Sequence, residues 1–169
     1  MLLMFEKEIR GGVSTIPARY SKANNKYMGE KFDSTQESKF VVYLEANNLY
    51  GWAMEHPLPV GNFEWMTENE FENWFAFSTQ EGKGCILEVD LEIPEHLHDL
   101  FNDLPLAPEG IKINGVEKRD SNLWDKNKYV IHHKNLKLCI KMGAKVAKIH
   151  RGVSFDEKAW MKPYIELNA

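Results

Sequence analysis

Residues 85–93 read CILEVDLEI, and this stretch decides the class of fold. Apolar side chains alternate here with acidic ones, namely Leu87, Val89, Leu91 and Ile93 with Glu88, Asp90 and Glu92. Because successive side chains of a β-strand point to opposite faces, the alternation predicts a strand with one buried and one solvated acidic face. Pro94 lacks an amide hydrogen for a ladder and ends the strand.

The segments on both sides alternate between helical and extended patterns. Residues 67–77 predict an amphipathic helix that opens with a capping box of Thr67 and Glu70, and Phe71, Trp74 and Phe75 follow at helical spacing. Further strands are expected at residues 39–44, 128–132 and 145–153, the first of them a buried strand of sequence KFVVYL. Further helices are expected at residues 95–102, 135–142 (ended by Gly143) and 155–167 (broken at Pro163), and residues 104–115 are expected to form a loop. The fold class is therefore mixed, α+β, with the strand order left open.

Length and composition favour one globular domain. The 169 residues are 43% hydrophobic and 12% aromatic, which suffices for a core and is too apolar for a disordered chain. No run of 18 apolar residues occurs, so no membrane span and no membrane partner are expected. A chain of this length is too short for a large multi-domain enzyme.

Cysteines and histidines give no pattern of a metal site. Cys85 and Cys139 lie far apart without a CxxC spacing, which predicts buried thiols in a reducing, intracellular compartment, nuclear or cytosolic. His132 and His133 are adjacent, so their side chains are expected to diverge on a strand. No zinc-ligand set is predicted from them.

Charge is distributed unevenly along the chain. Residues 61–111 carry twelve acidic groups and one basic group, whereas residues 112–169 carry thirteen basic groups and six acidic ones. The basic part contains candidate contacts to a DNA backbone, Lys137, Lys141, Lys145, Lys148 and Arg151. A merely solvated basic surface is the alternative.

One carboxylate follows directly on an apolar run. Glu45 comes at the end of the expected strand 39–44 and precedes the polar pair Asn47 and Asn48. A carboxylate held at a strand end suits Mg²⁺, which binds one or two carboxylates together with phosphate oxygens and waters. Two-metal phosphoryl transfer needs further carboxylates, so Glu45 by itself favours a solvated strand end over a metal site.

The longer string YLEANNLYGWAM, residues 43–54, resembles motif A of protein-primed family B DNA polymerases, above all those of Maverick/Polinton transposons. IRGGVS at residues 9–14 is similar to the Tyr-x-Gly-Gly region of that family. Blocks that resemble the same branch follow in order along essentially the whole chain, among them GCILEVDLEIP, LHDLFNDLPLAPE, DKNKYVIHHKNLKLCIKMG, KIHRGVSFDE and WMKPYIELN.

The resemblance implies a role for each matched residue. Glu45 takes the place of the metal-binding aspartate, and the Ala46 carbonyl also faces a metal. Tyr50 underlies the deoxynucleotide sugar and excludes a 2′-hydroxyl, whereas an ordinary core aromatic is the alternative for this residue. Asn48 and Leu49 match nucleotide-binding positions. Gly11 and Gly12 match the region where the backbone approaches template DNA, and a positive φ is the other role that adjacent glycines permit.

The implied organisation is that of a partial polymerase palm with an inserted α/β subdomain. Residues 1–38 would be a connector before the palm, 39–56 the palm strand with motif A, 57–133 the insertion between motifs A and B, and 134–169 a basic segment leading toward motif B. The whole enzyme would use two Mg²⁺ ions, a deoxynucleoside triphosphate, and a DNA template and primer, with a terminal priming protein as a further expected partner.

Three departures from the family pattern bear on activity. The motif aspartate is replaced by Glu45, the Tyr of Tyr-x-Gly-Gly by Ile9, and no Asp-x-Asp of motif C occurs in these residues. We therefore expect the isolated chain to be inactive as a polymerase. The alternative is a catalytically dead, transposon-derived remnant that binds DNA or protein; a free-standing metal-dependent nuclease is a weaker hypothesis, because it needs several convergent carboxylates.

Overall fold

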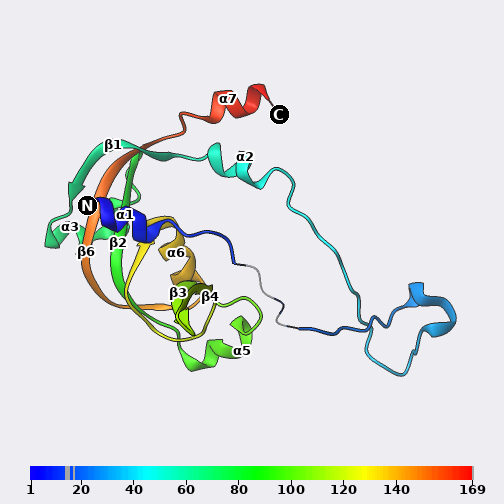
Figure 1. Ribbon diagram of the computed structural model, residues 1–169. Helices are drawn as coiled ribbons and strands as arrows, with labels where there is room; N and C mark the ends of the chain where they lie inside the picture. Colours follow the sequence, from blue (N-terminus) through cyan, green and yellow to red (C-terminus); the bar gives the residue numbers. More distant parts are fainter. Residues whose placement is uncertain (14–15, 17, 169) are drawn as a thin grey trace.

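The computed structural model describes residues 1–13, 16 and 18–168, and its centre is a four-stranded antiparallel sheet (Figure 1). The expected strand 85–93 is confirmed as β2 (Lys83–Glu92), which pairs with β6 (Lys145–Lys158) on one side and β5 (Lys126–His132) on the other. β1 (Leu58–Trp65) is added at the outer edge of β6, giving the order β1-β6-β2-β5. The α+β class is thereby confirmed.

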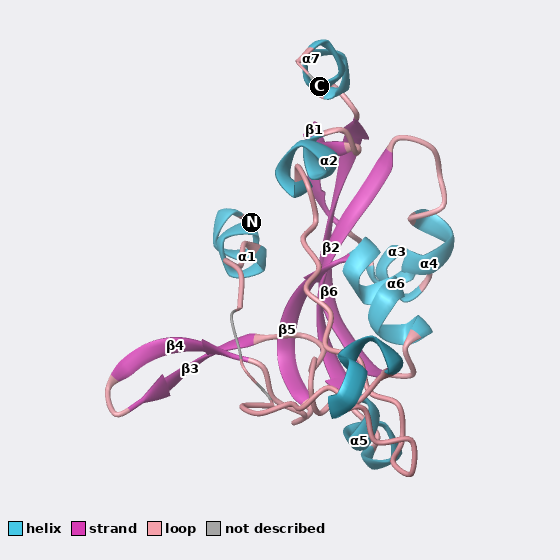
Figure 2. Cartoon of the chain, turned by 90° about the vertical axis from the view of Figure 1, so that its right-hand side faces the viewer, coloured by secondary structure: helices cyan, strands magenta, loops and turns pink. Residues whose placement is uncertain are grey.

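Helices cover one face of this sheet. α3 (Glu68–Glu72), α4 (Trp74–Phe77) and α6 (His133–Lys141) lie together on that face (Figure 2). The apolar face predicted for β2 packs against them, and its side chains at Leu87, Val89 and Leu91 are fully buried. Burial of these apolar side chains supplies the main stabilisation of the core.

The opposite face of β2 is less solvated than expected. α1 (Leu2–Glu8) lies over it and inserts Met4 into a second apolar cluster with Ile86, Val130, Val153 and Phe155. Glu88 on this face is buried, because Arg151 of the neighbouring strand neutralises its carboxylate. The predicted acidic surface is therefore wrong at Glu88, and of the three acidic residues Glu92 is the exposed one.

The helix expected at residues 67–77 forms in two parts that meet at Asn73. Its capping box is present, since the Thr67 amide donates to the Glu70 carboxylate over 2.8 Å. The break rotates the second part, so that Trp74 and Phe77 pack on the core while Phe75 is exposed, contrary to the expected apolar face.

Two other helical predictions are confirmed. The helix expected at residues 95–102 forms as η2 (Glu95–Leu97) followed by α5 (His98–Phe101). α6 ends as predicted at Gly143, whose φ of 104° lies in the region that favours glycine.

Residues 104–115 contain a strand rather than only a loop. β3 (Glu109–Ile113) pairs with β4 (Val116–Asp120) in an antiparallel hairpin. Asn114 and Gly115 form the turn, both with positive φ, which is the combination that two-residue hairpin loops require. The Asn-Gly pair was the available signal in the sequence.

The C-terminal prediction is wrong in its element types. Residues 155–158 continue β6 instead of starting a helix, because they pair with β1 and β2. The helix α7 (Lys162–Leu167) begins later, and Pro163 lies in its first turn, where a missing amide hydrogen costs no hydrogen bond. Pro163 therefore starts the helix rather than breaking it.

The buried strand expected at residues 39–44 does not form. Lys39 makes an isolated bridge with Asn24, and the chain then runs unpaired to α2 (Leu49–Met54), as Figure 1 shows. Apolar side chains along this stretch are exposed, from Phe40 at 57% to Tyr43 at 88%. An apolar run becomes a buried strand only beside a sheet edge, and this run lies apart from the four-stranded sheet.

The small lobe before this stretch is held by polar contacts. It contains η1 (Lys26–Lys31), and its Asn24 side chain accepts a hydrogen bond from the Asp33 amide over 2.9 Å. The main sheet, in contrast, unites residues of the expected segments 57–133 and 134–169. Within the described residues, no helix is both long enough and apolar enough to cross a membrane.

A buried ammonium group fixes the β3–β4 hairpin to the sheet. The Lys126 side chain is fully buried, and its Nζ lies 2.9 Å from Glu109 Oε1 and also donates to Asn122 Oδ1. Burial by itself would raise the pKa of Glu109, but hydrogen bonds from Lys126 and Asn122 outweigh it and lower that pKa.

Removing either partner of this pair is expected to have unequal effects. Glu109→Gln leaves the ammonium buried without a counter-charge and should lower the free energy of unfolding by about 2–3 kcal/mol. Lys126→Met leaves a carboxylate that can regain water, and should cost only about 1 kcal/mol. Denaturant unfolding of both variants measures this; a larger loss for Lys126→Met would contradict it.

Candidate functional site

The motif A-like residues lie on the exposed chain between the small lobe and α2. Glu45 and Ala46 belong to the unpaired stretch, and Asn48 follows with a positive φ of 51° as the N-cap of α2. Leu49 and Tyr50 form the first turn of that helix, 57% and 87% exposed. The alternative that Tyr50 is a core aromatic is therefore wrong.

Glu45 does not stand in a group of metal ligands. Among the residues that the structure describes, the one cluster of three potential ligands consists of His132, His133 and Glu157, on the main sheet. The two-Mg²⁺ site of the expected enzyme needs carboxylates from elsewhere, and Glu45 remains a predicted ligand.

The basic residues of β6 lie beside the acidic residues of β2. The cross-strand neighbours are Arg151 with Glu88, Lys148 with Asp90, and Lys145 with Glu92. Arg151 Nη2 approaches Glu88 Oε2 to 2.7 Å. The charge imbalance between the middle and the end of the sequence is thus partly compensated within one sheet, which weakens β6 as a polyanion surface.

The two basic residues of α6 occupy another face. Lys137 Nζ donates to the Ser78 carbonyl over 3.2 Å and lies 4.9 Å from the centre of the Phe75 ring. Lys141 is exposed in the last turn of the helix. α6 lies on the opposite side of the sheet from α1 (Figure 2), whereas Arg151 lines a hollow beside α1, so Lys137 and Lys141 do not share one surface with Arg151.

A basic hollow forms instead beside α1. Its volume is about 740 Å³, and it is bounded by α1 and by residues of β1, β3, β4, β5 and β6. Its acidic lining residues are Glu6 and Glu109. Its basic lining residues are Lys7, Arg10, Arg119, Lys128 and Arg151. We call this site the basic hollow.

Arg10 is held rigidly at the edge of the basic hollow. Its guanidinium lies 4.1 Å from the centre of the Tyr129 ring and donates to the carbonyl oxygens of Val130 and Glu8. The aromatic ring attracts the cation electrostatically. Because the Arg10 side chain is already held in place, it loses little conformational entropy when a ligand binds. Burial raises the pKa of Tyr129 to about 12, so its ring stays neutral beneath the cation.

The glycine pair lies close to the same hollow. Arg119 Nη1 donates to the Gly11 carbonyl over 3.2 Å. Neither Gly11 nor Gly12 has a positive φ, and an added Cβ would meet open space at both positions. Of the two roles expected for these glycines, a positive φ is wrong, and a close approach to a ligand stays a prediction.

Sequence reasoning missed most of the basic hollow. Lys7 and Arg10 lie near the start of the chain, whereas Arg119 and Lys128 come from a much later part of the sequence, and no spacing links the two pairs. Trp65 of β1, 46% exposed, also lines the hollow and lies under Arg151, 5.5 Å from ring centre to guanidinium. The packing of α1 and the β3–β4 hairpin beside the four-stranded sheet brings these groups together.

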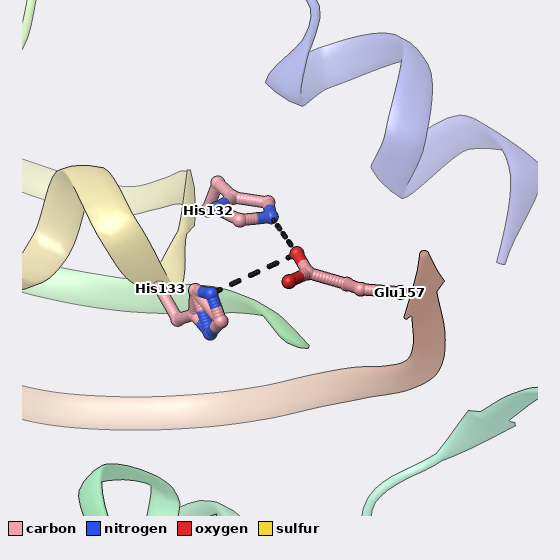
Figure 3. Close-up of side chains that lie close together, drawn as sticks. All are labelled: His132, His133 and Glu157. Carbon is pink, nitrogen blue, oxygen red and sulfur yellow. Dashed lines mark ion pairs between the residues drawn. The ribbon is translucent and has the colours of Figure 1, made fainter. Parts of the chain in front are cut away.

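The cluster of His132, His133 and Glu157 is the second assembled group of titratable side chains (Figure 3). His132 ends β5 and His133 begins α6, and this change from strand to helix turns the two rings toward each other, 4.4 Å apart between centres. The expected divergence is therefore wrong.

Burial, followed by the neighbouring His132, lowers the pKa of His133 to about 3. Burial by itself would raise the pKa of Glu157, but hydrogen bonds from His132 and Lys134 outweigh it and lower that pKa. Both groups are thus in the unprotonated form at neutral pH.

The two cysteines are buried free thiols, as expected. Burial raises the pKa of Cys85 to about 12, which makes it a weak nucleophile.

Comparison with protein-family models, with curated proteins and with solved structures finds no match to this chain. The polymerase resemblance therefore rests on the motifs of the sequence.

The depressed pKa of His133 predicts a loss of stability in acid. Below pH 6.5 an unfolded histidine binds a proton that the buried ring does not accept until about pH 3, so the free energy of unfolding falls as pH falls. In metal-free buffer, the loss between pH 7.5 and 4.5 should be about 2 kcal/mol smaller for His133→Leu than for the wild type. The free energy of unfolding is measured against pH by denaturant unfolding. The same pH dependence in the wild type and in His133→Leu would contradict this.

Proposed function

We propose that the chain is the motif A region of a protein-primed family B DNA-directed DNA polymerase, and that it contacts a DNA backbone through the basic hollow. The observation that carries the proposal is the convergence of four cationic side chains, besides the paired Arg151, on an open hollow beside Gly11. Residues 9–14 are the ones that resemble the template-contacting Tyr-x-Gly-Gly region.

The chemistry of the hollow suits phosphodiesters. Arginine guanidinium groups bind phosphate oxygens with two parallel hydrogen bonds, and Arg10 and Arg119 are held in place by backbone carbonyls. The exposed ring of Trp65 offers a stacking surface for an unpaired base. Because Arg151 is paired with Glu88, Arg151 supports the Trp65 ring and is not a free cation.

Motif A would supply one part of the nucleotidyl-transfer site. In the whole enzyme a primer 3′-hydroxyl attacks the α-phosphate of a deoxynucleoside triphosphate, and two Mg²⁺ ions stabilise the attacking and leaving oxygens. Glu45 would hold metal together with carboxylates of motif C, and Tyr50 would exclude a 2′-hydroxyl. Exposure of both side chains is compatible with these roles.

A catalytically dead remnant that binds DNA is the second candidate. Replacement of the motif aspartate by Glu45 favours it, because an additional methylene displaces the carboxylate in a site with tight metal distances. Both candidates share the DNA contact and differ in catalysis.

DNA binding is tested with two charge-matched triple variants and a labelled single-stranded oligonucleotide in fluorescence anisotropy. Neutralising Lys7, Arg119 and Lys128 with glutamine should weaken binding at low salt by about 10- to 100-fold and reduce the salt slope by about 2. Neutralising Lys137, Lys141 and Lys148 should have a smaller effect, because these residues lie outside the hollow. No binding of the wild type at low salt, or equal losses in both variants, would contradict the proposal.

Nucleotide incorporation is the second test. Neither the purified chain nor Glu45→Asp should extend a primed single-stranded template in Mg²⁺, because Glu45 belongs to no group of three potential ligands among the described residues and two-metal catalysis needs several carboxylates. Primer extension that EDTA abolishes and Glu45→Ala removes would overturn this expectation.

A further inference from the structure

The cluster of His132, His133 and Glu157 joins the start of α6 to the end of β6. His132 Nε2 lies 3.2 Å from Glu157 Oε1, and His133 Nε2 lies 3.8 Å from the same oxygen (Figure 3). The side chains of His133 and Glu157 are only 3% and 6% exposed. Two imidazoles and a carboxylate thus converge where little water reaches them.

His133 is incompletely satisfied in this arrangement. Both of its ring nitrogens are buried and have no hydrogen-bond partner. A buried polar group without a partner loses its hydration without compensation, so such groups are rare in folded proteins. Its location beside a buried carboxylate suggests that a ligand of the cluster supplies the missing interaction.

The separations fit a tetrahedral metal ion. Zinc–nitrogen and zinc–oxygen bonds of about 2.1 Å place neighbouring donor atoms about 3.4 Å apart. The two measured separations, 3.2 and 3.8 Å, bracket this value, and the three donors lie within 4.8 Å of one another. Small side-chain adjustments bring the two nitrogen–oxygen pairs to this spacing, and the two imidazole nitrogens, which lie within 4.8 Å of each other, move closer together when the ion binds.

We propose that His132, His133 and Glu157 bind one divalent transition-metal ion of the Zn²⁺ type. Two imidazole nitrogens and one carboxylate suit Zn²⁺ or Co²⁺, whereas Mg²⁺ prefers oxygen ligands alone. The fourth position faces a hollow of about 400 Å³ that Ser78, Lys134 and Lys137 help to line. Water or a small anion from that hollow completes the coordination.

The protonation states already suit metal binding. A metal ligand must be a neutral imidazole or an ionised carboxylate. Burial keeps His133 neutral, and hydrogen bonds from His132 and Lys134 keep Glu157 ionised.

Lys134 competes with the metal for the same carboxylate. Its Nζ lies 2.9 Å from Glu157 Oε2, and its amide donates to His132 Nδ1 over 3.2 Å. When the metal binds His132 Nε2, the ring proton shifts to Nδ1. Nδ1 then no longer accepts the hydrogen bond from the Lys134 amide, which lies in the exposed first turn of α6. The ammonium, 45% exposed, moves into solvent as the dication replaces it.

The test is titration of the full chain, freed of metal, with Zn²⁺ by calorimetry and with Co²⁺ by visible absorption. We expect one ion per chain, micromolar or tighter affinity, and the strong visible bands of four-coordinate Co²⁺. His133→Leu and Glu157→Gln should each weaken binding more than about 100-fold. Lys134→Met should strengthen it, because the competing charge is removed.

His150→Leu is the matched control. His150 also lies beside a carboxylate, with Nε2 2.9 Å from Asp90 Oδ1, but outside the cluster, so its replacement should leave affinity unchanged. Circular dichroism confirms that each variant is folded. Unaltered affinity in His133→Leu, weaker affinity in Lys134→Met, or a thiolate charge-transfer band from Cys85 or Cys139 would overturn the proposal.

Discussion

The antiparallel pairing of β2 with β6 is the constraint on which the rest of the structure depends. It places the most acidic part of the sequence beside the most basic part, so Glu88 becomes a buried partner of Arg151. It also buries the apolar residues of β2 completely. Both edges of this pair are then extended, by β5 and by β1, and each assembled group of side chains described above includes residues of the resulting sheet.

Two sites follow from this sheet, the basic hollow and the histidine–glutamate cluster. The basic hollow lies under α1, where Arg10 and Arg119 are fixed by backbone carbonyls. The histidine–glutamate cluster lies where β5 turns into α6, close to the end of β6. The first site offers cations for phosphate, and the second offers nitrogen and oxygen donors for a metal. The two chemistries are separate and can be tested separately.

Local patterns predicted the elements whose signals are short-range. The alternation at 85–93, the Thr67–Glu70 capping box and Gly143 each act within a few residues, and each is present. The sequence could not predict what depends on distant partners. The apolar run 39–44 has no strand beside it in the sheet, and Glu88 is buried through a residue 63 positions away. The hollow assembles side chains from six elements and their connections, and no spacing in the sequence records that convergence.

The central claim is that DNA contacts the basic hollow while motif A stays accessible. Photochemical cross-linking of the full chain to a thymine-containing single strand, followed by mass spectrometry of the attached peptides, tests it most directly. The predicted result is attachment at Trp65 and in the peptides that carry Arg10 and Arg119, and its loss at high salt. Attachment confined to α6, or no attachment at low salt, would contradict the claim.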